Sequence, residues 1–243
     1  MKIAQDYIVP VIRYSRTAHG IEFSQLLGTA FFINEGGIFL SASHVFSDGL
    51  KLCEREGGEI GLIMRDPERP QQRFLGKIAG WSCADEPSDV VVGITPHRAM
   101  SCFMVNSARI WLWQDVFSLG YAESAVARGE NFITPDVRGL KGHIVRKLPS
   151  GHLLTKPHPE AYELSFSIPS CMSGSPLVLR WDDEAPEGAP FPLLGVCVGT
   201  NTISIGGEAV ENYGLAHSIS PLLEWKPECL DGLPLGQFIQ PGH

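Results

Sequence analysis

Short apolar runs separated by turn-forming residues dominate this chain and restrict the folds open to it. Runs of 3 to 7 residues read as strands, among them residues 8–14, 27–33, 38–40, 90–94 and 193–198. Glycine and proline supply 26 and 18 of the 243 residues, a content that suits many tight turns. The segment Glu35-Gly36-Gly37 reads as a hairpin turn between two such runs. The pattern therefore predicts an all-β fold, either a sandwich or barrels.

Sustained helical periodicity is scarce. The best helix candidate is residues 221–225, with Ser220 as the N-cap and a proline in the first turn. The aromatic segment Trp111-Leu112-Trp113 opens a new set of expected strands. We therefore expect two domains, residues 1–110 and residues 111–243.

The charge balance argues against some classes of partner. The chain carries 19 basic and 27 acidic residues, a formal charge of −8, without a run of lysine or arginine, so we expect no nucleic-acid partner. No window approaches the roughly 18 consecutive apolar residues of a membrane span, so we expect no membrane partner. The spacing of the cysteines offers no zinc site, and we expect no metal and no cofactor.

The cysteines and the amino-terminal residues bear on the compartment. Six cysteines occupy positions 53, 83, 102, 171, 197 and 229 without a CxxC pair. An even number is compatible with a secreted disulfide framework, but residues 1–7 lack the apolar stretch of a signal peptide. We therefore expect free thiols and a cytoplasmic location, unless a leader has been removed.

Ser173 is the candidate nucleophile. It lies in the segment Pro169-Ser170-Cys171-Met172-Ser173-Gly174-Ser175-Pro176, a turn of small residues directly ahead of an apolar strand. Main-chain amides that flank a serine in such a turn can converge on one point, as an oxyanion hole requires. An ordinary Ser/Gly/Pro turn would have the same composition, so this segment alone leaves both interpretations open.

His44 and Asp89 are the candidates for the general base and for the acid that orients it. His44 follows the small residues of Ser41-Ala42-Ser43 at the end of an apolar strand, and imidazole exchanges protons near neutral pH. Asp89 precedes the apolar strand of residues 90–94, where its carboxylate would need a partner such as an imidazole N–H. Each residue alone could have a structural role, as an exposed histidine or a turn-capping aspartate.

Together these segments resemble the trypsin/chymotrypsin family, especially its intracellular and bacterial branch that includes the HtrA-type proteases. The matching segments are SASHV, SDVVVGI and CMSGSP, in the order His, Asp, Ser, and Asp89 comes 45 positions after His44. The resemblance implies two six-stranded antiparallel β-barrels with a short C-terminal helix. It also implies that Ser173 attacks the substrate, that His44 is general base and acid, and that Asp89 orients His44.

The resemblance extends to the oxyanion hole and the specificity pocket. It implies that the N–H groups of Cys171 and Ser173 hold the oxyanion. By offset from Ser173 and by strand alternation, the pocket residues are expected to be uncharged: Ser167, Ile168, Val198, Gly199, Thr200 and Ala216. The pocket should then prefer an uncharged P1 side chain, because a buried charge there would lack a counter-ion. His217 alternates with Ala216 and is expected to face away from the pocket without a role.

Three residues depart from the family pattern. Cys171 stands where the family usually has glycine, and a side chain there could disfavour the backbone conformation of the oxyanion hole. Cys197 stands where a serine usually lies beside the catalytic aspartate. Met172 stands where secreted relatives carry the aspartate that pairs with a newly cut amino terminus, so we expect no activation by cleavage.

The sequence supports two functional hypotheses, an enzyme and a binding module. In the first, the chain is an endopeptidase that acts on protein or peptide substrates, controlled by a regulatory partner, an allosteric change or substrate supply. In the second, it is a catalytically silent relative that uses the same barrels as a binding or regulatory module. All three triad residues are present, which favours the enzyme.

Overall fold

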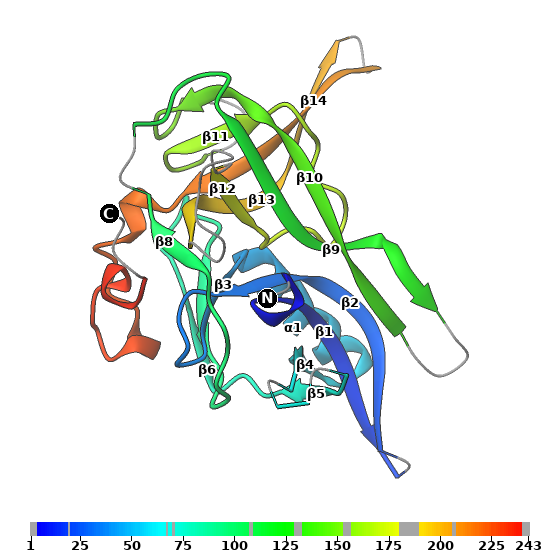
Figure 1. Ribbon diagram of the computed structural model, residues 1–243. Helices are drawn as coiled ribbons and strands as arrows, with labels where there is room; N and C mark the ends of the chain where they lie inside the picture. The colour runs from blue at the N-terminus through cyan, green and yellow to red at the C-terminus, as the bar shows by residue number, and fades with distance from the viewer. Residues whose placement is uncertain are drawn as a thin grey trace.

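The architecture consists of two seven-stranded sheets, one above the other in the view of Figure 1. This computed structural model describes residues 4–18, 20–66, 68–69, 71–106, 109–128, 133–152, 157–179, 190–205 and 208–239. The first sheet contains strands β1 to β7 and the second contains β8 to β14. The predicted all-β, chymotrypsin-like two-barrel fold is confirmed.

The first sheet is curled, in the strand order β5-β4-β1-β2-β3-β7-β6. All its pairings are antiparallel. Its strands are β1 (Ile8–Thr17), β2 (Gly20–Phe32), β3 (Ile38–Ser41), β4 (Glu59–Arg65), β5 (Arg73–Gly76), β6 (Gly80–Cys83) and β7 (Val91–Ile94).

The second sheet contains a closed barrel. Its order is β12-β9-β10-β11-β14-β13-β8, and β12 also pairs with β13, which closes six antiparallel strands. The seventh strand, β8, lies parallel to β13 outside this ring. The strands are β8 (Phe103–Val105), β9 (Asp115–Arg128), β10 (Ile133–Leu148), β11 (Ala161–Leu164), β12 (Pro176–Leu179), β13 (Phe191–Ile205) and β14 (Glu208–Ser218).

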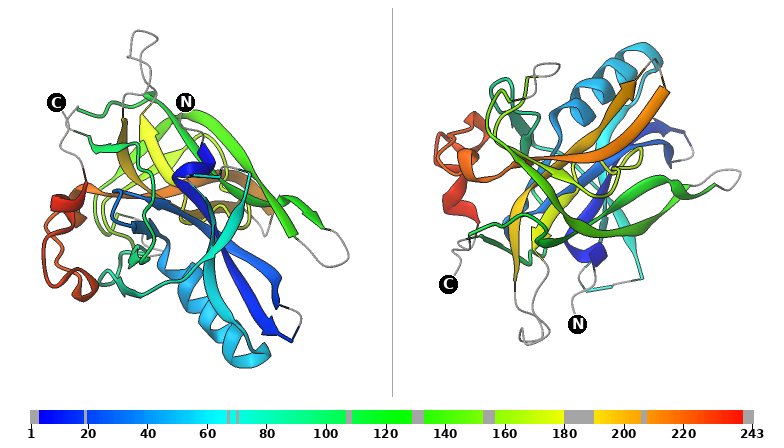
Figure 2. Two further views of the ribbon diagram at one scale, coloured as in Figure 1. Left: turned by 60° about the horizontal axis from the view of Figure 1, so that its bottom comes forward. Right: turned by 90° about the horizontal axis from the view of Figure 1, so that it is seen from above.

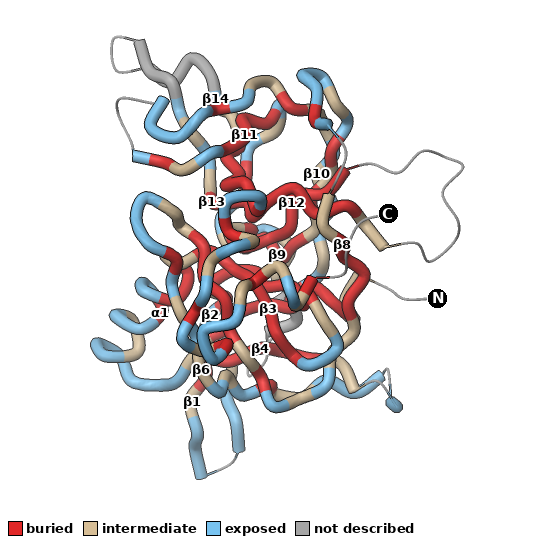
Figure 3. Tube along the Cα trace, turned by 90° about the vertical axis from the view of Figure 1, so that its left-hand side faces the viewer, coloured by how far each residue is buried: buried red, intermediate tan, exposed pale blue. Residues whose placement is uncertain are grey.

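The apolar runs form strands that are buried on both faces, which explains why they do not alternate with polar residues. In β2, Phe31 belongs to one hydrophobic cluster, while Ala30 and Phe32 belong to another. In β3, Leu40 likewise belongs to the first cluster and Phe39 to the second. The first of these clusters includes residues of both sheets, so it holds the sheets together, and the buried segments run through the middle of the molecule (Figure 3).

The helices differ from the sequence prediction. The one α-helix in the described part of the chain is α1 (Ser43–Glu56), which packs on one side of the first sheet (Figure 2). The helix predicted at residues 221–225 is only a 3-10 turn, η2 (Ser220–Leu222), with Leu223 as its C-cap. Ser220 lies inside this turn, and the N-cap is Ile219.

The other short helical turns lie near the two ends of the described chain. They are η1 (Ala4–Asp6), η3 (Glu228–Leu230) and η4 (Leu235–Phe238). The C-terminal turns return from the second sheet to the edge of the first, where the Cys229 N–H donates to Ser82 Oγ over 3.1 Å. Within the described part of the chain, no helix is both long and apolar enough to cross a membrane.

Candidate active site

His44 and Asp89 lie at the adjoining ends of two paired strands. β3 ends at Ser41, and Ala42 leads into the first turn of α1, which carries His44. β7 runs antiparallel to β3, and Val91 at its start lies opposite Ser41. Because Asp89 comes just before β7, this register brings the two side chains together.

The His44 and Asp89 side chains are hydrogen-bonded. Nδ1 of His44 lies 2.6 Å from Oδ2 of Asp89, and the His44 main-chain N–H donates to Oδ1 over 2.9 Å. Burial alone would raise the pKa of the Asp89 carboxyl, but the hydrogen bonds and charge of His44 lower this pKa below its ordinary range. Asp89 is therefore ionised at neutral pH, and its carboxylate accepts the hydrogen bond from Nδ1 of the imidazole. The His44 side chain is 39% exposed, so the imidazole is open to solvent.

The loop that carries Ser173, between β11 and β12, is held against β2 by Thr29. The Thr29 N–H donates to the Ser173 carbonyl over 2.9 Å, and the Thr29 hydroxyl donates to the Cys171 carbonyl over 3.0 Å. Thr29 is fully buried, and its Oγ1 also accepts the Tyr121 N–H at 2.9 Å. Sequence reasoning did not identify Thr29, because a single threonine in a strand carries no distinctive signal.

Gly174 allows this close approach of loop and strand. Its φ is +89°, a backbone conformation that residues other than glycine rarely adopt. A β-carbon at this position would lie 2.0 Å from the Thr29 carbonyl oxygen and 2.3 Å from Ser41 Oγ. The glycine after the candidate nucleophile is therefore required by both conformation and space.

The main-chain groups around Ser173 are arranged with two amides available. The Ser170 carbonyl accepts a hydrogen bond from the Glu123 N–H at 3.0 Å. This carbonyl therefore does not accept from the Ser173 amide. The N–H groups of Cys171 and Ser173, predicted to hold an oxyanion, have no hydrogen-bond partner among the described residues. They are therefore free to donate to a ligand.

Cys171 adopts the backbone conformation that glycine would favour. Its φ is +68°, a left-handed conformation that costs roughly 1–3 kcal/mol for such a residue. The expected obstacle at this position is thus overcome by the surrounding contacts, among them the Thr29 bond to its carbonyl. Burial, together with the charge of Glu123, raises the pKa of the Cys171 thiol to about 11, so the thiol is protonated and poorly nucleophilic.

The Ser173 hydroxyl points to the second barrel. Its Oγ donates to the Val198 carbonyl over 3.4 Å, and the described hydrogen bonds include none between Ser173 and His44. A cleft with a volume of about 420 Å³ opens beside His44 and Cys171. Its walls include Leu26 and Leu27 of β2 together with the exposed face of α1.

The predicted pocket residues lie on neighbouring segments of the second barrel. The Ile168 N–H donates to Thr200 Oγ1 over 2.9 Å, which joins two of them. Val198 lies at the register shift between Cys197 and Gly199 in β13, and φ of Gly199 is +148°. Ala216 is fully buried in β14, while Ser167 is exposed. Their role in specificity remains a prediction.

One residue lies elsewhere than the sequence suggested, and another has a contact that the sequence did not suggest. Cys197, expected beside Asp89, is buried in the second barrel, where its Sγ lies 3.6 Å from Ser118 Oγ. It pairs with Ala216 across β13 and β14, so both side chains belong to the same hydrophobic cluster. His217, expected to have no role, is buried, and its Nδ1 accepts the Asp89 N–H at 3.0 Å.

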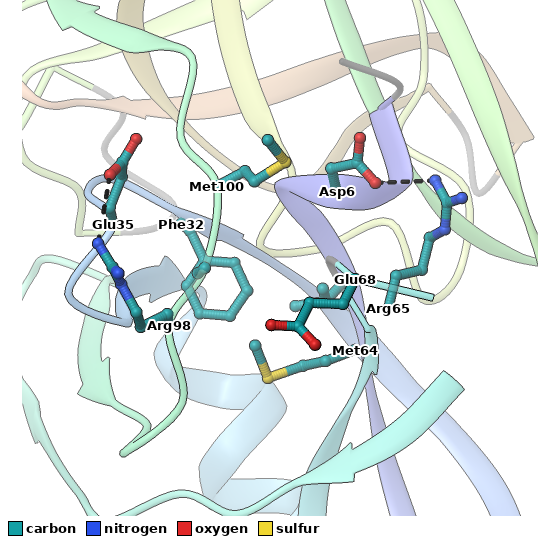
Figure 4. A pocket seen from close by; sticks show the side chains of 10 residues that line it. Asp6, Phe32, Glu35, Met64, Arg65, Glu68, Arg98 and Met100 are labelled. Carbon is teal, nitrogen blue, oxygen red and sulfur yellow. Dashed lines mark hydrogen bonds and ion pairs between the residues drawn. The ribbon is translucent and has the colours of Figure 1, made fainter. Parts of the chain in front are cut away.

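A second cavity lies apart from these residues. It has a volume of about 370 Å³ and lies over Phe32, Met64 and Met100 (Figure 4). The ion pair between Asp6 and Arg65, at 2.8 Å, lies at its edge. None of the predicted catalytic residues lines this cavity. In the described part of the chain, no group of three or more His, Cys, Asp or Glu side chains could hold a metal ion.

The comparisons with known proteins agree with this geometry at the level of the fold. No protein-family model and no curated protein matches the chain. Among solved structures, the HtrA-type protease AlgW with a decapeptide is similar, with a TM-score of 0.57 and 15% identity over 91% of this chain and 63% of that chain. The crystal structure of Deg5 is similar with a TM-score of 0.56 and 16% identity, over 93% of this chain and 90% of that chain.

These similarities define the class of fold. The chain has a chymotrypsin-like two-barrel fold, which it shares with the HtrA-type protease AlgW. Because the identities are below one fifth, the likeness establishes the fold and not the activity. The chain also spans less than two thirds of AlgW, so the activity of that whole protein is not transferred to it.

Proposed function

We propose that the chain is a serine endopeptidase that hydrolyses peptide bonds through an acyl-enzyme on Ser173. The observation that carries this proposal is the His44–Asp89 hydrogen bond of 2.6 Å in a fold shared with HtrA-type proteases. The unpaired amides of Cys171 and Ser173 add support, because acyl transfer needs donors for a developing oxyanion.

In the first half of the proposed reaction, Ser173 Oγ attacks the scissile carbonyl carbon while its proton passes to Nε2 of His44. The amides of Cys171 and Ser173 donate to the oxyanion of the tetrahedral intermediate. His44 then gives the proton to the leaving amine, and the ester on Ser173 remains. Water repeats these steps in the second half and restores the free hydroxyl. Asp89 stays ionised throughout and stabilises the imidazolium.

The Ser173 hydroxyl must first leave the Val198 carbonyl. The bond between them is 3.4 Å long, beyond the usual range for O–H···O bonds, so little stabilisation is lost when it breaks. Rotation about χ1 then directs the proton to His44. Catalytic hydrogen bonds are often long or poorly aligned before a substrate binds, and tighten in its complex.

The substrate is proposed to be a protein or peptide with an uncharged P1 side chain. The AlgW structure contains a decapeptide, which supports peptide binding by this fold. In this chain, the cleft beside His44 would hold the residues after the scissile bond. The P1 side chain would lie near Ile168, Thr200 and Ala216, none of which could neutralise a charge.

The compartment and the mode of control complete the proposal. All six cysteines are free thiols in the structure, which supports a reducing compartment such as the cytoplasm. Met172 cannot form the ion pair that activates secreted relatives, so control is assigned to a regulatory partner, an allosteric change or substrate supply.

A catalytically silent binding module is the second candidate. The observation that favours it is the direction of the Ser173 hydroxyl, which is bonded to Val198 and not to His44. A silent module would keep this arrangement when a peptide binds. We favour the enzyme because the His44–Asp89 hydrogen bond and the unpartnered amides of Cys171 and Ser173 support it.

A peptide library with diverse P1 residues tests the proposal. Wild-type protein should cleave peptides with uncharged P1 residues, with small aliphatic ones preferred, and Ser173→Ala should lower the rate on the order of a millionfold. Cleavage by Ser173→Ala at the wild-type rate would overturn the assignment of the nucleophile. Strong selectivity for Arg, Lys, Asp or Glu at P1 would overturn only the pocket.

A further inference from the structure

The main chain and side chain of Asp89 are held from two sides. From the first barrel, the Asp89 carbonyl accepts the Ser43 N–H at 3.3 Å, and both carboxylate oxygens are bonded to His44. The remaining polar group is the Asp89 N–H, which donates to Nδ1 of His217 over 3.0 Å. This last bond comes from β14, a strand of the second barrel.

His217 is placed to transmit the position of one barrel to the other. It is 1% exposed, and it lies 128 residues from Asp89 in sequence. On β14 it pairs with Ala161 and Val196, so its backbone is fixed in the closed barrel. A buried ring on a paired strand has little room to move, so its Nδ1 fixes the position of the Asp89 N–H.

The direction of the bond fixes the chemical form of the ring. A main-chain N–H can only donate, so Nδ1 of His217 is the acceptor and carries no proton. The ring is then the neutral tautomer with its proton on Nε2. His44 has the opposite arrangement, since its Nδ1 faces an ionised carboxylate and carries a proton. Asp89 thus lies between two imidazoles in opposite tautomeric states.

We propose that His217 is a positioning residue for the catalytic acid, one that holds Asp89 through its neutral Nδ1 and so keeps His44 oriented toward Ser173. This inference rests on the proposed function, because its consequence for catalysis requires that His44 acts as the base. His217 itself does not touch the reacting atoms in this mechanism. Its effect reaches them through the Asp89 main chain and carboxylate.

Two substitutions test the role in catalysis. His217→Asn keeps an acceptor oxygen at the δ position, whereas His217→Leu keeps the approximate volume and removes the acceptor. We expect His217→Leu to lower kcat by about 10- to 100-fold with KM nearly unchanged, since an unsatisfied buried N–H displaces Asp89. His217→Asn should keep kcat within about threefold of wild type. Equal losses in the two variants, or no loss in His217→Leu, would overturn the inference.

A spectroscopic measurement tests the same inference without activity. In protein labelled with ¹⁵N-histidine, long-range proton–nitrogen correlation spectra distinguish the two neutral tautomers and the imidazolium. We expect His217 to be the Nε2–H tautomer at neutral pH, and a proton on Nδ1 would overturn the inference even if His217→Leu fails to fold. Wild-type protein without any peptidase activity would instead contradict the proposed function. In that case the measured tautomer of His217 would still test whether His217 accepts the Asp89 N–H.

Discussion

At the scale of single residues, the Asp89 carboxylate shows how a partly buried charge is maintained. Burial disfavours its ionised form, yet two hydrogen bonds from His44 lower its pKa. Asp89→Asn removes this charge without changing the shape of the side chain. The substitution therefore isolates the electrostatic contribution of the pair.

We predict a pH-dependent loss of stability in Asp89→Asn. A lowered folded-state pKa means that Asp89 stabilises the fold fully above its unfolded-state pKa of about 4, and that this stabilisation is lost as the pH falls through the folded-state pKa. The measurement is the free energy of unfolding of both proteins between pH 6 and pH 2. The difference should shrink below about pH 4. A difference that stays constant over this range would show that the pair does not stabilise the fold.

At the scale of elements, the contact between β2 and the Ser173 loop depends on Thr29. Thr29→Val keeps the volume but leaves the Tyr121 N–H and the Cys171 carbonyl without their partner. We predict that the free energy of unfolding falls by about 1–3 kcal/mol and that kcat falls at least about tenfold, because the Cys171 amide loses its fixed orientation. Thr202→Val, at an exposed position of β13, is the control and should change neither quantity. Unchanged kcat in Thr29→Val would show that the loop is held by other contacts.

The sequence predicts the buried strands well but does not predict helix α1. The apolar runs indicated β1, β2, β3, β7 and β13, because strands buried on both faces leave a strong signal. Helix α1 escaped prediction, because only Val45, Phe46 and Gly49 are buried among its residues. Its apolar stripe is therefore narrow, and the glycine weakens the helical pattern.

The alternation of β14 placed His217 on the correct face but gave the wrong conclusion about it. Ala216 faces the cluster inside the second barrel, and His217 faces the other way, as the alternation predicts. That other face meets Asp89 of the first barrel and not solvent. A single strand carries no information about which element will cover its second face. Cys197 was misplaced for a related reason, since the register shift after it depends on pairing with β14.

At the scale of the whole molecule, the arrangement of the chain argues against activation by cleavage. β1 pairs with both β2 and β4, so a cut between residues 8 and 25 would disrupt the first sheet. Met172 is fully buried in an apolar cluster and offers no carboxylate to a new amino terminus. Both features support the prediction that the chain needs no cut near its amino terminus to be active.

We predict that the chain reacts without a cut within residues 1–25. The measurement is the intact mass of the active species, taken before and after turnover of a peptide substrate. The mass should correspond to the uncut chain in both samples. Activity that appears only after trimming within these residues would contradict the prediction and would require another group to replace the missing aspartate.

The central claim, that Ser173 is a nucleophile activated by His44, is tested most directly by a fluorophosphonate probe. We predict that the folded wild-type protein forms one covalent adduct and that peptide mapping places it on Ser173. Ser173→Ala should form none, and His44→Ala should react far more slowly, because its serine lacks a base. An inert wild-type protein with an intact fold, or an adduct on another residue, would contradict the claim.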